Sequence, residues 1–437
     1  MSNSKPRLVF LNRSYWPDIE ATGQLLTDLC VGLSNRFDVH VICGQPNQPE
    51  REAVFAAAGH EIRHGVTIHR LEHRRFQKKN GVGRILNLVS FYRAADRYLR
   101  QWESSADVVV SETDPFLLPL AGDRFARRVG APHVAYLQDI YPDVAEAVGK
   151  SRIPMVGSAI RHQLRRVYHR AERVVVLGTC MSDRLTDSPW DVPRHKVEII
   201  PNWADCGSIQ PIAHDGNAFR KRVELDDSFV VMHSGNMGLT QRLEVLIEAA
   251  AEPHWPTRAK LLLVGNGASR DQLIAKKEAL NLTDDRVRFV NYQPREELAH
   301  SLSAADLHIV SMHENITGCL CPSKLYGIMA AGRSILGIAD PRTDLCRTIK
   351  EHQLGWCVPP GSPAAVAKAV ADAERQITYE GELNRRAREG AERHYDRDVI
   401  VERFTHLLID CLSGERELPD AITPHVRSRG TDVAVPV

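Results

Sequence analysis

Short apolar runs alternate with longer helical patterns in the first half of the chain, and this alternation restricts the fold more than any other feature of the sequence. The runs occupy residues 7–11, 38–43, 67–71, 106–111, 133–137 and 173–178. Buried runs of this length, separated by helices, are typical of a parallel sheet that is covered on both faces. The first half is therefore predicted to form a doubly wound α/β domain.

The alternation begins again beyond a segment near residues 200–215 that is rich in proline and glycine. Its second set of runs occupies residues 228–235, 259–267, 286–292, 305–311 and 333–338. We expect one domain over 1–205, a second over 206–395, a helix over 396–412 that returns to the first domain, and a flexible tail over 413–437. Because ligands bind beyond the carboxyl ends of the strands in such sheets, the two domains should face one central cleft.

Composition excludes several classes of protein. Lys and Arg number 56 against 55 Asp and Glu, so no overall field would attract nucleic acid. Nine scattered cysteines favour a reducing, cytoplasmic compartment. Only Cys319 and Cys321 lie close together, and structural zinc normally needs four ligands, so we expect no metal site. No run approaches the ~20 apolar residues of a membrane span, and the N-terminus predicts a strand rather than a signal peptide.

Glycines follow several of the predicted strands, at positions where a phosphate could approach the backbone. Gly23 opens a helix after the first strand, although an ordinary strand-to-helix turn explains it equally well. Gly235 and Gly238 precede an amphipathic helix, and we place Arg242 one turn into that helix, within reach of a diphosphate. A solvated surface arginine is the alternative. Gly265 and Gly267 lack the third glycine of a dinucleotide site, which argues against an NAD-dependent dehydrogenase.

The stretch CPSKLYGIMAAG, residues 321–332, predicts an anion site. Pro322 fixes the entry to a helix, Ser323 can cap it, and the N–H groups of the first turn should lie beside the ammonium of Lys324. A capped structural helix with an exposed lysine is the alternative. Gly327 is unusual, because glycine costs ~1 kcal/mol against alanine inside a helix.

Taken together, these stretches resemble the family 4 glycosyltransferases, which are retaining enzymes of the two-domain GT-B fold. The matching pieces are YWPDIEATGQLLTDL, QDIYPDVAEAVG, IIPNWAD, SGNMGLTQRLEVLIEAA, LLLVGNG and PSKLYGIMAAGRSILG, which span nearly the whole chain. The closest likeness is to enzymes of bacterial capsule, O-antigen or exopolysaccharide biosynthesis. The resemblance implies a nucleotide-sugar donor, a glycan or polyprenyl-diphosphate-linked acceptor, and no metal or other cofactor.

The resemblance also implies roles for individual residues. Arg242, Lys324, Asp139 and Glu314 would serve catalysis. The donor would contact Gly23, Gln138, Gly235, Asn236, Gly238, Asn291, Tyr292, Pro322, Ser323, Lys324 and Leu325. The family's usual pair of glutamates is absent, since Cys319 and Gly327 occupy those positions, and Glu314 is the candidate to replace the first of them.

Two other functions stay open, the first because those glutamates are missing and the second because it shares the fold. The chain could be a catalytically silent GT-B subunit that binds sugar nucleotides, or a sugar-nucleotide epimerase, which would need paired carboxylates and a histidine at its cleft. A basic amphipathic segment over 73–100 and another over 150–173 suit contact with an anionic membrane, although ordinary surface helices explain them equally well. We expect a cytoplasmic protein, peripheral at the cytoplasmic face of the inner membrane.

Overall fold

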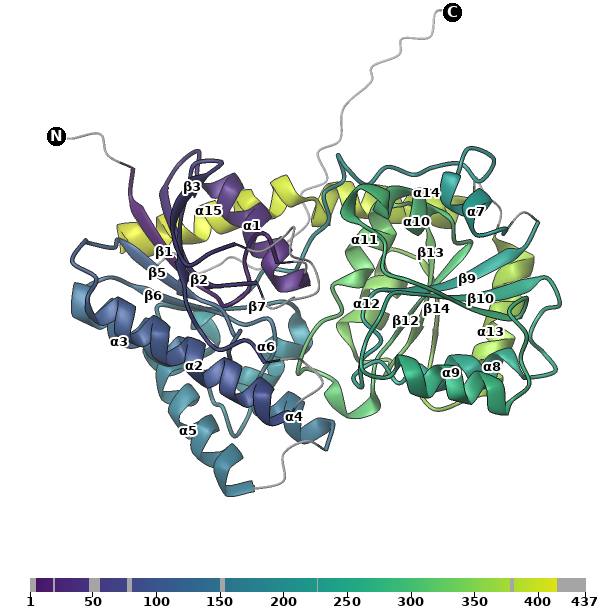
Figure 1. Cartoon of the computed structure of the whole chain (residues 1–437), viewed down its shortest axis with the longest axis horizontal. Helices are drawn as coiled ribbons and strands as arrows, with labels where there is room; N and C mark the ends of the chain where they lie inside the picture. The colour runs from purple at the N-terminus through teal and green to yellow at the C-terminus, as the bar shows by residue number, and fades with distance from the viewer. Residues whose placement is uncertain are drawn as a thin grey trace, which may run out of the picture.

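The structure is a computed structural model that describes residues 5–18, 20–46, 56–76, 81–149, 154–225, 227–377 and 381–414. Two lobes lie side by side, and the last helix runs from the second lobe back to the first (Figure 1). Most of the tail expected over 413–437 lies outside the described residues. None of the described helices is both long enough and apolar enough to cross a bilayer.

The N-terminal domain is built on an eight-stranded sheet of order β3-β4-β2-β1-β5-β6-β7-β8. Its strands are β1 (Arg7–Leu11), β2 (Asp38–Gly44), β3 (Gly59–Arg63), β4 (Val66–Leu71), β5 (Val108–Ser111), β6 (His133–Tyr136), β7 (Arg173–Val176) and β8 (Val197–Ile199). Its helices are α1 (Ala21–Leu33), α2 (Gly81–Arg100), α3 (Leu118–Val129), α4 (Asp143–Ala147), α5 (Pro154–Arg170) and α6 (Thr179–Thr186).

The C-terminal domain holds a six-stranded sheet of order β11-β10-β9-β12-β13-β14. Its strands are β9 (Phe229–Ser234), β10 (Ala259–Val264), β11 (Val287–Val290), β12 (Leu307–Ser311), β13 (Ser334–Ile338) and β14 (Gly355–Val358). Its helices are α7 (Ala218–Arg222), α8 (Glu244–Ala250), α9 (Arg270–Ala279), α10 (Leu298–Ser303), α11 (Lys324–Ala330), α12 (Asp344–Glu351), α13 (Pro363–Gln376) and α14 (Glu382–Gly390), and α15 (Arg397–Ser413) follows them.

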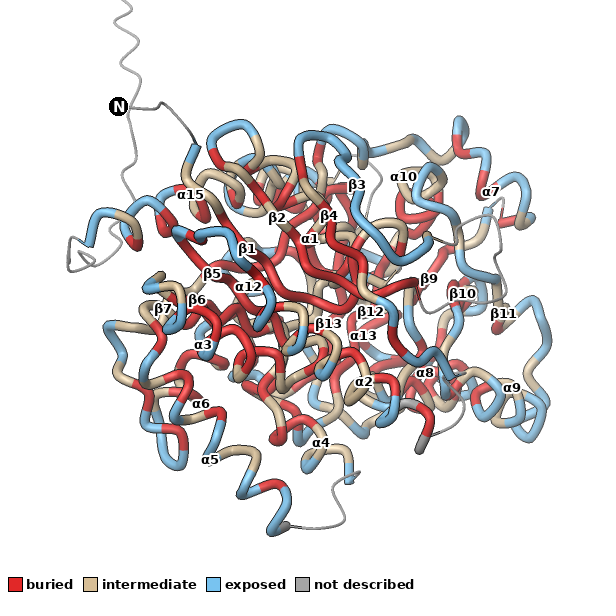
Figure 2. Tube along the Cα trace, turned by 60° about the vertical axis from the view of Figure 1, so that its left-hand side comes forward, coloured by how far each residue is buried: buried red, intermediate tan, exposed pale blue. Residues whose placement is uncertain are grey.

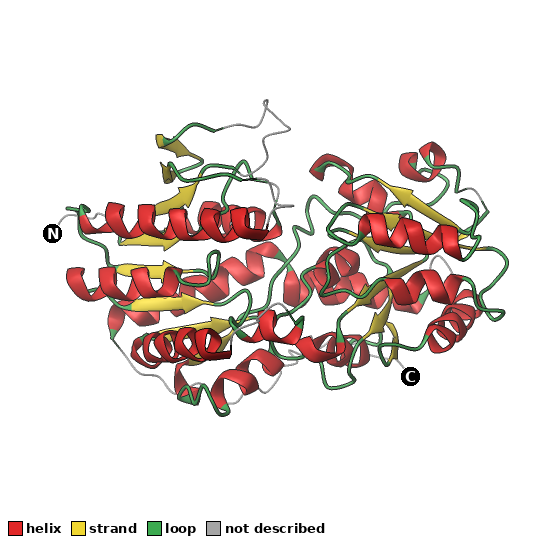
Figure 3. Ribbon diagram, turned by 60° about the horizontal axis from the view of Figure 1, so that its bottom comes forward, coloured by secondary structure: helices red, strands yellow, loops and turns green. Residues whose placement is uncertain are grey.

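Helices cover both faces of each sheet, as the doubly wound prediction requires (Figure 3). In the N-terminal domain, Phe91 of α2 and Phe125 of α3 belong to the core on one face, while Leu29 of α1 and Phe404 of α15 belong to the core on the other. The interior strands of both sheets are buried almost throughout (Figure 2). This double coverage explains why the strands read as continuous apolar runs rather than as alternating patterns.

Every strand that the apolar runs predicted is present, and three further strands were missed. β3 is antiparallel to β4 and exposed along its length, so it carries no apolar run. β8 has three residues, and β14 begins at a glycine and is only partly buried. Edge strands bury little surface, which removes the signal that the interior strands carry.

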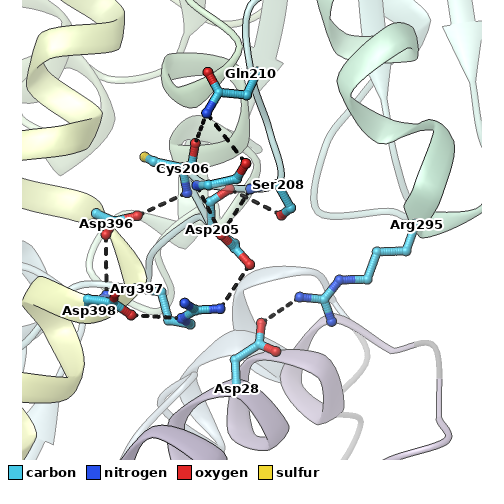
Figure 4. A network of polar contacts seen from close by, with 10 residues as sticks. Asp28, Asp205, Cys206, Ser208, Gln210, Arg295, Asp396, Arg397 and Asp398 are labelled. Atoms are coloured by element: carbon cyan, nitrogen blue, oxygen red, sulfur yellow. Dashed lines mark hydrogen bonds and ion pairs between the residues drawn. The ribbon is translucent and has the colours of Figure 1, made fainter.

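The chain crosses between the domains twice, and the two crossings are joined. Ala204 pairs with Asp396 as a parallel bridge, the Cys206 N–H donates to Asp396 over 2.9 Å, and Arg397 pairs with Asp205 over 2.9 Å. Beside them, Asp28 of α1 forms an ion pair with Arg295 of the C-terminal domain over 2.8 Å (Figure 4). α15 then packs against α1.

Candidate active site

The strand order reverses once in each sheet. Polar loops follow the strands beside each reversal. In the C-terminal sheet the reversal lies between β9 and β12, and in the N-terminal sheet it lies between β1 and β5. Loops that follow strands on the two sides of such a reversal diverge and leave a crevice for a ligand. The loop after β9 contains Gly235 and Asn236, and the loop after β5 begins at Glu112.

Contacts between the domains border this cleft. The Ile140 N–H donates to the Cys319 carbonyl over 2.8 Å, and Asp139 bridges to Leu320. Farther along, the Asp344 carboxylate accepts from the N–H groups of Thr179 and Cys180, each over 3.0 Å. The loop that precedes α11 is therefore held directly against the N-terminal domain.

Lys324 lies across Gly235. Its ammonium donates to the Asn236 carbonyl over 3.1 Å, and a Cβ at Gly235 would lie 2.6 Å from the Lys324 Cε. Gly235 has φ of +119°, a conformation that L-residues rarely adopt. Glycine at 235 is thus required twice, once by the backbone and once by the lysine side chain above it.

The Lys324 ammonium has no carboxylate partner among the described residues. Burial lowers the pKa of this lysine to about 8. Beneath it, His233 is buried, and burial together with the Lys324 charge holds the pKa of that imidazole well below its usual range. Lys324 is therefore a partly buried cation without a counter-ion among the described residues, which is suited to a bound anion.

The glycines after β10 support this loop instead of forming a dinucleotide site. A Cβ at Gly265 would collide with the Gly235 carbonyl, and one at Gly267 would collide with the Met237 backbone. The Met237 N–H also donates to the Asn266 carbonyl over 2.9 Å. Gly265 and Gly267 let the two loops pack backbone to backbone, which fixes the loop beneath Lys324.

Most N–H groups of the Gly235 loop are already engaged in hydrogen bonds within the protein. The Gly235 N–H donates to Val264, the Met237 N–H to Asn266, and the Gly238 N–H to the Gln241 side chain. The Asn236 N–H donates to none of the described residues. This loop therefore offers one backbone donor beside the Lys324 ammonium.

Arg242 does not lie inside a helix, so that prediction is wrong. It precedes α8, has φ of +45°, and forms a two-pronged ion pair with Glu314 at 2.6 and 2.8 Å. Arg242 lowers the pKa of the Glu314 carboxyl, although a backbone hydrogen bond contributes more. The structure thus brings two predicted residues together, but the charge of Arg242 is compensated whereas that of Lys324 is not.

The Ser323 side chain forms no cap hydrogen bond, so its predicted capping role is also wrong. Pro322 precedes it at the turn into α11, and Leu325 is buried in the core behind the helix. Gly327 faces Leu302, whose Cδ1 would lie 3.4 Å from an added Cβ. The helix therefore has room for a small side chain at 327, and its packing does not demand glycine.

On the N-terminal side, Gly23 packs against the loop after β1. A Cβ at 23 would lie 3.1 Å from the Ser14 carbonyl carbon. Asn291 and Tyr292 are exposed in the loop after β11. Gly23 lies in the first turn of α1, whereas Asn291 and Tyr292 follow β11, which ends before the predicted run 286–292 does. None of the three contacts Lys324 among the recorded interactions of the described residues.

Gln138 belongs to a buried polar chain that sequence reasoning missed. Its amide nitrogen donates to Glu112 over 3.4 Å, and its amide oxygen accepts from Asn202 over 3.1 Å. Glu112 is buried, its second carboxyl oxygen has no partner among the described residues, and burial raises its pKa well above the usual range. This network of buried polar side chains fixes the orientation of Gln138. The one sequence signal of the network is the polar run SETDP, which begins at the last residue of β5.

Asp139 accepts a hydrogen bond from the Thr113 hydroxyl over 2.8 Å. Burial raises the pKa of its carboxyl to about 7, and the Asp114 charge adds to this shift. An acid whose pKa is higher in the folded chain stabilises the fold below its unfolded pKa and loses that contribution as the pH rises through the folded value.

Asp139→Asn should therefore gain stability relative to the wild type between about pH 4 and about pH 7, by on the order of a few kcal/mol. The asparagine keeps the oxygen that accepts from Thr113 but does not ionise. Urea unfolding of both proteins across this range measures the difference. A difference in unfolding free energy that stays constant with pH would contradict the raised pKa.

Comparisons with known proteins agree with this geometry. The family described as "Glycosyl transferase 4-like domain" matches residues 21–203, and the family described as "Glycosyl transferases group 1" matches residues 215–394. The chain is 28% identical over 309 residues to WbjE of Pseudomonas aeruginosa, named as a glycosyltransferase, with 70% of this chain and 75% of WbjE covered. It is 26% identical over 408 residues to WcaI of Escherichia coli K12, whose name assigns it to colanic acid biosynthesis, with 90% and 97% covered.

Solved structures support the fold alone. Sucrose-phosphate synthase from Thermosynechococcus elongatus superposes with a TM-score of 0.77 at 17% identity, over 94% of this chain and 100% of that one. Anabaena HepE in complex with UDP-glucose superposes with a TM-score of 0.68 at 15% identity, over 92% and 99%. The chain therefore belongs to the family 4 glycosyltransferases, in which a glycosyl transferase 4-like domain and a glycosyl transferases group 1 domain form the two halves of a GT-B fold.

Proposed function

We propose that the protein transfers a sugar from a nucleotide-sugar donor to a glycan or lipid-linked acceptor, with retention of the anomeric configuration, in the biosynthesis of a cell-surface polysaccharide. The names of WbjE and WcaI support the glycosyltransferase activity, and that of WcaI supports the polysaccharide. The UDP-glucose in the HepE complex supports the donor class. Neither a silent binding subunit nor an epimerase is favoured, since both family descriptions name glycosyl transferases.

The observation that carries this proposal is the uncompensated ammonium of Lys324 above Gly235. In glycosyl transfer from a nucleotide-sugar, negative charge develops on the leaving diphosphate while the sugar takes on oxocarbenium character. A cation that is already desolvated and fixed stabilises that charge without reorganising solvent. Lys324 and the Asn236 N–H, which donates to none of the described residues, would bind the diphosphate. Stabilising the leaving group in this way requires no metal and no protein nucleophile.

Arg242 would join this site only when Glu314 releases it or turns with it toward the donor. Because the pair is about half exposed, its rearrangement costs little. Gln138, held by Glu112 and Asn202, would contact the donor sugar from the opposite domain. Asp139, whose pKa lies near 7, would accept the proton of the incoming acceptor hydroxyl.

A thermal-shift screen against UDP-, GDP-, ADP- and dTDP-sugars tests the donor class. One of them should raise the unfolding temperature, since a ligand at 100 times its dissociation constant stabilises the fold by ~2.7 kcal/mol. The same donor should shift a Lys324→Ala variant less. If no nucleotide-sugar shifted the wild type at millimolar concentration, the proposed donor class would be wrong.

Contact with the cytoplasmic face of an anionic membrane is the second part of the proposal. Ile85 at the start of α2 is 63% exposed, and Met155 at the start of α5 is 82% exposed. The arginines of α5 contribute less than the sequence suggested, because Arg161 pairs with Asp143 and Arg170 pairs with Asp123. Lys78 and Lys79 lie outside the described residues. Binding to anionic vesicles that weakens with salt would support the contact, and no binding would remove it.

A further inference from the structure

A groove on the N-terminal domain lies beside α2 and is separate from the Lys324 site. It encloses about 510 Å³ between Arg74 on one wall and Leu86, Val89, Arg93, Ala94 and Arg97 of α2 on the other. We call it the α2 groove. The Arg74 wall directly follows β4, so the groove begins at the carboxyl edge of the sheet, which faces the cleft.

Hydrogen bonds hold the walls of the α2 groove in place. The Arg74 N–H donates to the Ser90 hydroxyl over 3.0 Å. The Asn87 side chain bonds both the N–H and the carbonyl of Phe76, at 2.8 and 2.9 Å. His73 is buried beneath the groove and lies 3.3 Å from the Gln45 carbonyl. The groove is therefore a built feature of the fold rather than a gap between loose side chains.

Three arginines of this groove carry charges that nothing in the described chain compensates. The guanidinium groups of Arg74, Arg93 and Arg97 have no hydrogen-bond or ion-pair partner among the described residues. Elsewhere in this domain, Arg13 pairs with Asp114 over 3.0 Å, and Arg170 pairs with Asp123 over 2.7 Å. One carboxylate, that of Glu72, also lines the groove, so its side chains keep a net positive charge.

The α2 wall combines these charges with apolar surface. Leu86, Val89, Arg93 and Arg97 recur every three or four residues, so they lie along one side of the helix. The apolar members lie toward the start of α2 and the arginines toward its end. A ligand that fills the groove must therefore present an anionic group beside apolar atoms. Guanidinium groups favour phosphate, which they can bind through two parallel hydrogen bonds.

We propose that the α2 groove binds an amphiphile that carries a phosphate or diphosphate, as the anionic head of the acceptor substrate. This inference rests on the proposed function, since it assigns the acceptor to a lipid-linked class. Arg93 and Arg97 bind the phosphate oxygens, Arg74 closes the opposite side, and the apolar stem lies on Leu86 and Val89. The groove selects acceptors and takes no part in breaking the donor bond.

Calorimetric titration with farnesyl diphosphate, kept below its critical micelle concentration, tests the proposal on the full chain. A charge-assisted hydrogen bond contributes roughly tenfold to hundredfold in affinity, so Arg93→Gln/Arg97→Gln should weaken binding at least tenfold. Arg166→Gln is the matched control, because Arg166 lies on α5 away from the groove and also lacks a partner among the described residues. Both variants change exposed side chains and should fold normally.

Two further titrations distinguish binding in the α2 groove from binding at other anion sites. Lys324→Ala should bind farnesyl diphosphate as tightly as the wild type, and inorganic pyrophosphate should bind the wild type more weakly than farnesyl diphosphate. Equal binding by the double variant and the wild type, or no binding by either, would overturn the proposal. Loss of binding in Arg166→Gln or Lys324→Ala, or pyrophosphate binding as tight as that of farnesyl diphosphate, would also overturn it.

The nucleotide-sugar thermal shift distinguishes a failure of the α2 groove proposal from a failure of the proposed function. If the groove is wrong and the donor site is right, the wild type and the double variant give the same farnesyl diphosphate titration, with or without binding, and both keep the nucleotide-sugar shift. If the donor site is wrong, the wild type shows no nucleotide-sugar shift whatever the groove binds.

Discussion

Lys324→Ala should lower the turnover of glycosyl transfer by roughly 10²- to 10³-fold, the range found when one preorganised donor to a developing anion is removed. The ammonium is fixed above Gly235 by its contact with the Asn236 carbonyl and has no carboxylate partner among the described residues. Its charge is therefore fully available to the leaving diphosphate. Initial rates at saturating donor and acceptor measure the loss.

Lys221→Ala is the matched control, because Lys221 is exposed on α7 and its ammonium also has no partner among the described residues. Its turnover should equal that of the wild type. Since burial lowers the Lys324 pKa to about 8, kcat/KM of the wild type should also fall as the pH rises above that value. A Lys324→Ala variant that keeps its turnover would remove this lysine from the chemistry.

Gly235→Ala should both destabilise the protein and abolish most of its activity. Alanine at φ of +119° costs on the order of 1–3 kcal/mol in backbone strain. Its Cβ would also lie 2.6 Å from the Lys324 Cε, so either the lysine or the loop must move, which adds roughly 1–3 kcal/mol. The displaced ammonium would no longer lie where the proposed donor places its diphosphate, so turnover should fall about as far as in Lys324→Ala.

Gly59→Ala is the control that distinguishes the backbone strain of Gly235→Ala from its clash with Lys324. Gly59 has φ of +142°, and nothing lies within 4 Å of an added Cβ. It should show the strain alone, with turnover unchanged. Denaturant midpoints and initial rates of both variants provide the comparison. Equal destabilisation of Gly59→Ala and Gly235→Ala would mean that Lys324 does not pack against Gly235.

The fold could be predicted from sequence because its signal is strong and local. Strands buried on both faces, such as β1 and β9, consist mostly of consecutive apolar residues, and this pattern is visible without any knowledge of their neighbours. β3 could not be predicted in this way, because it is exposed and depends on its pairing with β4. Pairing partners are a tertiary property that a run of residues does not encode by itself.

The sequence indicated single candidate residues of the site but none of the contacts between them. The sequence indicates Gly235 and Lys324 separately. It does not indicate the hydrogen bond from Lys324 to Asn236, because 88 positions separate these two residues. The pairing of Arg242 with Glu314 was not predicted, and it compensates the Arg242 charge while the Lys324 charge has no carboxylate partner among the described residues. Glu112 drew no attention, since a single acid after a strand gives no sign that it will be buried.

Gly327 illustrates the same limit. The sequence indicates a lost glutamate, and the structure shows room beside Leu302 rather than a packing demand for glycine. The packing of α11 therefore does not explain why glycine stands at 327. The uncompensated Lys324 charge, which the chemistry of a leaving diphosphate needs, does not depend on a carboxylate at that position.

In the proposed function, this cleft transfers a sugar from a nucleotide-sugar. Proton NMR of the reaction with the donor found by thermal shift tests it most directly, by following the anomeric proton of the transferred sugar and the release of the nucleoside diphosphate. We predict one nucleoside diphosphate for each glycosidic bond formed, with the anomeric configuration of the donor retained. Donor that is bound but returned unchanged with every acceptor, donor that is epimerised, or a product of inverted configuration would contradict the account.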